Sequence, residues 1–156
     1  MKRIILEYQQ VDLILTRICH QLVEDHGDFN HTAILALQPK GILLGKAIVR
    51  KLETLFGIHA TYGELDTTFH RDDFRRSDKL LIPNEVNIDF EIENKRIILV
   101  DDVLYTGRSI RAALDAVNDY GRPASIELVT LINRKYKREV PIQPDYIGEN
   151  VDSRTD

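Results

Sequence analysis

Two adjacent aspartates at the end of an aliphatic run are the residues of this sequence best suited to chemistry. The run Ile97–Val100 is followed directly by Asp101 and Asp102, and shortly afterwards by the small-residue loop Leu104–Ser109, which reads LYTGRS. Two carboxylates at the end of a buried strand cost free energy unless a ligand supplies hydrogen-bond donors there. The order of residue types therefore predicts a binding site where this strand meets the loop.

The loop that follows the aspartates has the composition of an anion site. Gly107 lets the backbone approach an anion closely, and Thr106 and Ser109 add hydroxyl donors. The amino end of the following helix contributes a positive partial charge, which favours phosphate. Because Asp101 and Asp102 would repel that phosphate, we expect them to accept hydrogen bonds from another part of the same ligand. Vicinal ribose hydroxyls are suitable donors.

The spacing of apolar residues predicts the helices and strands that position this site. Strands and helices alternate along the chain, and the aliphatic strands show no polar alternation. Such strands imply a parallel sheet covered on both faces, which binds ligands beyond the carboxyl ends of its strands. The expected elements are a helix through Ile14–Leu22, a strand at Thr32–Leu37, a helix from Gly41 to Gly57, a two-sided strand through Ile88–Ile92, a strand at Arg96–Val100, a helix from Ser109 to Gly121 and a strand at Ser125–Ile132.

Length, charge and cysteine content limit the class of protein. The 156 residues, 43% of them hydrophobic, suit a single domain over residues 1–156, and a net charge of -4 disfavours a protein whose whole surface binds nucleic acid. The single cysteine, Cys19, lies among apolar residues at helical spacing, which predicts a buried thiol. The five histidines lack the spacing of metal ligands, and we expect them to be solvated. No apolar run suits a leader or a membrane span, so we expect a cytoplasmic protein.

The stretch VDDVLYTGRSIRAALDAV resembles the phosphoribosyl pyrophosphate (PRPP) motif of the type I phosphoribosyltransferases. It is most similar to the PyrR family, the pyrimidine operon regulators that also have uracil phosphoribosyltransferase activity, and the similarity extends through FHRDDFRR, YGRPASIELVTLINR and PDYIG. The resemblance implies an α/β fold of the type I phosphoribosyltransferases, with a mostly parallel sheet flanked by helices, a flexible loop and a small hood. It implies transfer of phosphoribosyl from PRPP to uracil, giving UMP, by a homodimer or higher homo-oligomer.

The same resemblance assigns roles to individual residues. Asp101 and Asp102 would hold the ribose hydroxyls, and catalysis would depend on Asp102, Lys40 and Arg71, the last in the flexible loop Asp66–Lys79. Mg²⁺ would arrive with PRPP, and no dedicated protein metal site is expected. The remaining substrate contacts would come from the 5′-phosphate loop (Leu104, Tyr105, Thr106, Gly107, Arg108 and Ser109), the pyrophosphate loop (Gln38, Pro39, Lys40 and Gly41) and the hood over the base (Tyr146 and Ile147).

Two other functions stay open at the level of sequence. Purine phosphoribosyltransferases of this fold commonly place an acid within the phosphate loop, but Tyr105 occupies that position, which favours a pyrimidine. An RNA-binding regulator would resemble this chain at Thr16, His20 and Arg138.

The RNA alternative is weakened by two positions at which such regulators tend to carry basic residues. Gln143 and Glu149 stand there in this sequence, and each missing phosphate contact lowers RNA affinity. The basic run Arg134–Arg138 is compatible with either an RNA surface or a solvated turn.

The carboxyl-terminal residues carry a separate expectation. Relatives of this type continue beyond the equivalent of Val151 with a further strand-like segment, whereas this sequence ends at Asp156 in polar residues. Polar residues bury too little apolar surface to offset the entropy lost on ordering, so we expect the last residues to be loosely held. The base pocket would then be more open, with weak uracil affinity and near-normal PRPP binding.

Overall fold

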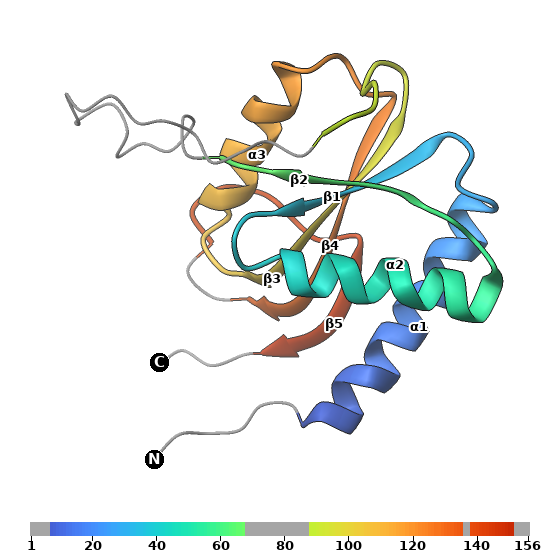
Figure 1. The fold of residues 1–156 in the computed structure, drawn as a ribbon. Coiled ribbons are helices and arrows are strands. Elements are labelled where there is room, and N and C mark those ends of the chain that lie inside the picture. The colour runs from blue at the N-terminus through green and yellow to red at the C-terminus, as the bar shows by residue number, and fades with distance from the viewer. Residues whose placement is uncertain (1–6, 68–87, 136–137, 152–156) are drawn as a thin grey trace.

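A parallel sheet of five strands is the centre of the computed structural model, which describes residues 7–67, 88–135 and 138–151. The strand order is β2-β1-β3-β4-β5, and every neighbouring pair is parallel. Figure 1 shows α1 and α2 together on one side of this sheet and α3 on the other. In chain order the elements are α1 (Tyr8–His26), β1 (Thr32–Leu37), α2 (Ile42–Phe56), β2 (Thr61–Leu65), β3 (Arg96–Leu104), α3 (Arg108–Asn118), β4 (Ser125–Arg134) and β5 (Tyr146–Val151).

Two apolar cores lie on the two faces of the sheet. Ile34 and Ile98 face α1 and α2, whereas their chain neighbours Leu35 and Leu99 face α3, and all four are fully buried. Side chains of successive strand residues point to opposite faces, so a strand covered on both sides must be apolar throughout. This explains the absence of polar alternation in the sequence and confirms the predicted parallel sheet with helices on both faces. Within the described ranges, no helix combines the length and apolar character that crossing a bilayer requires.

The predicted boundaries of the second helix agree closely with α2, whereas α1 extends beyond Ile14–Leu22 at both ends and α3 ends at Asn118, before Gly121. Gly41 immediately precedes α2, and Gly57 ends it in the left-handed conformation, with φ of 66°. Cys19 is fully buried on α1, as its spacing predicts. The strands extend further than the apolar runs that predict them, since β3 continues through both aspartates to Leu104 and β4 continues to Arg134.

The two-sided strand predicted through Ile88–Ile92 is not formed, and the sequence did not reveal β2. Ile88 and Phe90 pack against the core beside α3 and Ile92 is buried in it, but the backbone turns at Asn94 instead of pairing. The alternating residues Ile88, Phe90 and Ile92 therefore pack against the core without pairing to a neighbouring strand. The strand β2 contains Gly63 and a single aliphatic residue, so its place beside β1 comes from the sheet and not from local propensity.

The prediction that every histidine is solvated is wrong for His26, which lies at the end of α1 and is 7% exposed. Its Nδ1 lies 2.9 Å from Thr32 Oγ1 and its Nε2 lies 2.5 Å from Glu127 Oε1. Burial, followed by the charge of Arg96, lowers the pKa of His26 despite the opposing effect of Glu127. A neutral imidazole then donates from one nitrogen and accepts at the other. Tyr146 completes this cluster by donating its hydroxyl to Asp25 at 2.6 Å.

Replacing His26 tests whether this cluster supports the fold. We expect His26→Ala to lower the free energy of unfolding by about 2 kcal/mol, because Thr32 and Glu127 lose a buried partner. His31→Ala is the matched control, since His31 is exposed and its removal should cost almost nothing. Urea unfolding of the two variants and the parent measures the difference, and equal stabilities of the two variants would contradict it.

Candidate active site

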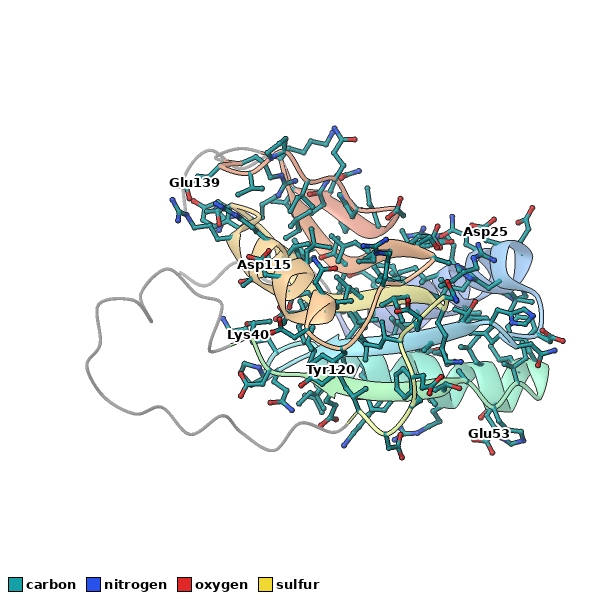
Figure 2. All side chains as sticks on the ribbon, turned by 90° about the horizontal axis from the view of Figure 1, so that it is seen from above. Asp25, Lys40, Glu53, Asp115, Tyr120 and Glu139 are labelled. Carbon is teal, nitrogen blue, oxygen red and sulfur yellow. The ribbon has the colours of Figure 1, made fainter. Side chains whose placement is uncertain are left out.

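Two loops meet at the edge of the sheet where β1 and β3 end. Because Ala36 pairs with Val100 in parallel register, the segment Gln38–Gly41 after β1 emerges beside the carboxyl end of β3. Gly41 lies so close to β3 that a Cβ atom there would stand 2.3 Å from the carbonyl oxygen of Val100, which only glycine avoids. Figure 2 shows Lys40 at the end of the molecule opposite to Asp25 of α1. The predicted pyrophosphate loop therefore lies directly beside the predicted ribose site.

The paired aspartates lie between the two loops and differ in accessibility. Asp101 is 8% exposed, and its Oδ1 accepts the backbone N–H of Asp102 at 2.9 Å. Asp102 is half-buried, and its Oδ1 accepts the N–H of Val103 at 2.7 Å. Burial raises the pKa of Asp101 to about 7, Asp102 adds to that rise, and the charge of Lys40 opposes it. The pair thus offers a buried carboxyl group with a raised pKa next to a more accessible carboxylate.

The loop between β3 and α3 has the backbone shape of an anion site. Gly107 adopts a φ of 92°, which favours glycine, and immediately precedes α3. The hydroxyl of Thr106 accepts the N–H of Arg108 at 3.3 Å, which fixes the turn into the helix. Arg108 and Ser109 lie exposed in the first turn, where helix N–H groups are available to a ligand. Thr106, Gly107, Arg108 and Ser109 are therefore gathered around one helix start.

A segment that the sequence did not assign to the site lies behind this loop. The Arg138 guanidinium donates to the carbonyl oxygen of Tyr105 and to Asn133 Oδ1, both at 2.6 Å. The N–H groups of Glu139 and Val140 lie 2.8 and 3.0 Å from the carbonyl oxygen of Thr106. The only signal in the sequence was the basic run after β4, which indicates charge but not the direction in which that charge points.

Tyr105 is held on both its backbone and its ring. Its carbonyl accepts from Arg138, and the guanidinium carbon of Arg134 lies 4.0 Å from the centre of its ring. Such a distance is typical of a cation–π contact. Tyr105, at the loop position where an acid is expected in purine enzymes, is thus held by Arg134 at the end of β4.

The structure does not bring Tyr146 and Ile147 to the two loops. Both lie in β5 of the main sheet. Ile147 pairs with Thr130 of β4, which pairs with Asp101 of β3, so Ile147 is level with Asp101 but two strands away. The carbonyl oxygens of Ile147 and Gly148 accept hydrogen bonds from Arg17 of α1. The pyrimidine-binding role expected for these backbone groups stays a prediction. Asn150, bonded to Asn133 at 3.0 Å, lies nearer the carboxyl end of β5.

Comparison with known proteins identifies the family. Residues 3–155 match the model of the phosphoribosyl transferase domain. The protein is 42% identical to the bifunctional protein PyrR of Picosynechococcus sp. over 147 residues, covering 94% of this chain and 82% of that protein. It is 40% identical to the bifunctional protein PyrR of Bacillus subtilis over 153 residues, covering 96% and 83%. The chain belongs to the PyrR family of phosphoribosyltransferases.

Solved structures confirm the fold of this PyrR family member. A hypoxanthine phosphoribosyltransferase from Staphylococcus aureus superposes with a TM-score of 0.74 at 18% identity, covering 97% of this chain and 78% of that one. A hypoxanthine-guanine phosphoribosyltransferase from Bacillus anthracis gives a TM-score of 0.74 at 15% identity, covering 97% and 85%. These similarities confirm the type I phosphoribosyltransferase fold predicted from sequence and carry no information on the base.

Arg71 and most of the loop Asp66–Lys79 lie outside the described residues, as do residues 152–156 at the carboxyl terminus. The roles expected of them stay predictions.

The raised pKa of Asp101 predicts how stability changes with pH. In an unfolded chain an aspartate ionises near pH 3.9, so between about pH 4 and 7 the unfolded state releases a proton that the folded state keeps. This proton balance lowers the parent's stability as the pH rises. Asp101→Asn cannot ionise, so we expect its melting temperature to gain on that of the parent between pH 5 and pH 8. Asp115→Asn, which removes an exposed acid of α3, should follow the parent, and parallel curves for the parent and Asp101→Asn would contradict the buried acid.

Proposed function

We propose that this PyrR family member transfers phosphoribosyl from PRPP to uracil, giving UMP and pyrophosphate. The observation that carries the proposal is the meeting of two loops and an acid pair at one sheet edge, where Gly41 lies against the carbonyl of Val100. PRPP presents a pyrophosphate, two ribose hydroxyls and a 5′-phosphate in that order. The pyrophosphate loop, the aspartates and the phosphate loop lie in the matching order from β1 to α3.

Each part of the substrate has a chemically suitable partner. The pyrophosphate would bind Gln38–Gly41, the ribose hydroxyls would donate to Asp101 and Asp102, and the 5′-phosphate would bind Leu104–Ser109. Asp102 is the better candidate for direct contact, because it is half-buried whereas Asp101 is 8% exposed. Asp101 would support it from below.

Mg²⁺ fits this site as an ion that is held mainly by PRPP. Asp101 and Asp102 at the carboxyl end of β3 are carboxylates that could add protein oxygens to such an ion. A hard cation that prefers phosphate, hydroxyl and water ligands suits such a sparse set. When bound, the ion would neutralise charge on the pyrophosphate.

The reaction itself places three demands on the chain. Loss of pyrophosphate gives an oxocarbenium-like sugar, so the chain must neutralise the leaving group, exclude water and hold the base nitrogen in line. Lys40 and Arg71 would supply the positive charge. A lysine provides a point charge without the bidentate fork of arginine, so orientation of the pyrophosphate would depend more on the backbone of Gln38–Gly41.

Uracil is favoured as the base by the identity and fixation of Tyr105. Tyr105 stands at the loop position where purine enzymes commonly place an acid, with its ring held by Arg134 and its backbone carbonyl held by Arg138.

Turnover with different bases tests this choice. We expect uracil to release pyrophosphate from PRPP, and hypoxanthine and guanine to be at least tenfold poorer, because the phosphate loop carries Tyr105 in place of an acid that could meet a purine nitrogen. Pyrophosphate release is measured with each base at equal concentration in the presence of Mg²⁺. Turnover with a purine and none with uracil would refute the proposal.

The ribose assignment is tested by Asp102→Asn. The amide oxygen can still accept from Val103, so the fold should be unchanged, but the charge-assisted bonds to the ribose hydroxyls are lost. We expect PRPP to bind about tenfold more weakly, measured by isothermal titration, and Asp115→Asn to bind like the parent. Equal PRPP affinity in Asp102→Asn and the parent would remove Asp102 from the ribose site.

RNA-binding regulation is the second candidate, since the relatives are named bifunctional. The geometry gives it less support than the enzyme. Thr16 accepts from Lys51 of α2, and His20 packs edge-on against Phe56, whereas Arg138 points inward to the phosphate loop. Titration with a pyrimidine-leader RNA would test this function. Homo-oligomerisation remains an expectation from the family resemblance, and a cytoplasmic location remains an expectation from the sequence.

A further inference from the structure

The segment Arg138–Val140 holds two successive carbonyl groups of the phosphate loop. Arg138 donates to the carbonyl oxygen of Tyr105 at 2.6 Å, and the N–H groups of Glu139 and Val140 both lie within 3.0 Å of the carbonyl oxygen of Thr106. A Cβ atom at Gly107 would stand 3.1 Å from the carbonyl oxygen of Val140, so the segment also packs closely against the start of α3. The segment Arg138–Val140 therefore fixes the phosphate loop through the carbonyl groups of that loop.

Because the carbonyl groups of the loop are held by this segment, the geometry of the peptide unit determines where the N–H groups of the loop point. In a planar trans peptide the carbonyl and the N–H of the same unit point in opposite directions. Holding the carbonyl of Tyr105 toward Arg138 turns the N–H of Thr106 away from Arg138. Holding the carbonyl of Thr106 in the same way turns the N–H of Gly107 away. The two donors thus face the side from which an anion would approach.

Arg138 lies partly buried beside the phosphate loop and is held there by hydrogen bonds. Its guanidinium is half-buried and donates at the same time to Asn133 Oδ1 at 2.6 Å, and Asn133 in turn donates to Asn150 at 3.0 Å. One planar fork therefore joins the loop after β3 to the ends of β4 and β5. A lysine has three donors on one atom and cannot span two separated acceptors in the same way.

Glu139 adds a second link from the same segment. Its carboxylate pairs with Arg108, the first residue of α3, on the exposed side of the loop. The pair holds the Arg108 side chain beside the segment.

We propose that Arg138 is a positioning residue for the 5′-phosphate, which acts by holding the carbonyl of Tyr105 so that the loop presents its N–H groups to that phosphate. The inference rests on the proposed function, and it assigns to Arg138 a task inside the site in place of the RNA contact suggested by sequence. Arg138 itself touches no substrate.

Three ligands separate this role from a general loss of structure or charge. UMP and PRPP both carry the 5′-phosphate, whereas inorganic pyrophosphate carries only the group assigned to Gln38–Gly41. Isothermal titration with each ligand in the presence of Mg²⁺ would be done on the parent, Arg138→Met, Arg138→Lys and the control Arg122→Met. Arg122 is exposed between α3 and β4, at the opposite edge of the sheet, so the control removes the same charge away from the loop.

The expected result is selective. Arg138→Met should weaken UMP and PRPP by about tenfold, the effect of one charge-assisted hydrogen bond, and leave pyrophosphate within about twofold. Arg138→Lys should recover only part of the loss, because it restores the charge but not the fork. Unchanged UMP affinity in Arg138→Met would overturn the proposal, as would equal losses for UMP and pyrophosphate. Full recovery in Arg138→Lys would assign the effect to charge alone and also overturn it.

Two further measurements keep the test decisive. Melting temperatures show whether Arg138→Met folds, and Glu139→Gln provides a variant whose altered side chain is exposed and should fold in any case. It should show the same selectivity with a smaller effect, and no selectivity would count against the segment's role. Turnover of the parent with uracil is recorded separately. A parent that binds UMP but has no uracil turnover would defeat the proposed function and leave the positioning result intact.

Discussion

Everything at the candidate site depends on the carboxyl end of β3, where the apolar part of a strand buried on both faces is followed by two acids. The apolar residues up to Val100 are excluded from water by helices on either side, so the next residue, Asp101, has little solvent to stabilise its charge. The sheet cannot relieve this cost by moving the residue, because β3 is the central strand with a partner on each side. Burial therefore raises the pKa of Asp101, and the charge of Lys40 opposes that rise.

The neighbouring loops follow from the same arrangement. Parallel strands end on the same side of the sheet, so the pairing of β1 with β3 brings together the loops that follow them. Close approach then depends on Gly41, whose missing side chain makes room for the backbone of Val100. The phosphate loop needs more help, because a short turn has few internal hydrogen bonds, and the segment Arg138–Val140 provides them.

The local spacing of apolar residues in the sequence was sufficient to predict the elements that bury their own apolar face. The helices α1 and α2 and the strands β1, β3 and β4 could be predicted because their aliphatic residues are the ones that make the core. It failed for β2, which owes its conformation to pairing with β1, and for Ile88–Ile92, where alternating apolar residues dock without pairing. At the site, the motif residues around Asp101 and Gly107 were predictable from sequence. The inward direction of Arg138 and the burial of His26 were not predictable from sequence. Arg138 bonds to Tyr105, 33 positions away in the chain, and His26 bonds to Glu127, 101 positions away.

The contact between α1 and β5 has a consequence for how copies of this chain behave in concentrated solution. β5 is an outer strand of the sheet, and an outer strand normally offers unpaired backbone groups to which another chain can add. Arg17 covers the carbonyls of Ile147 and Gly148 at 3.0 and 2.8 Å, so α1 occupies part of the position that an added strand would need. The docking of α1 therefore hinders the addition of another strand at these two residues of β5.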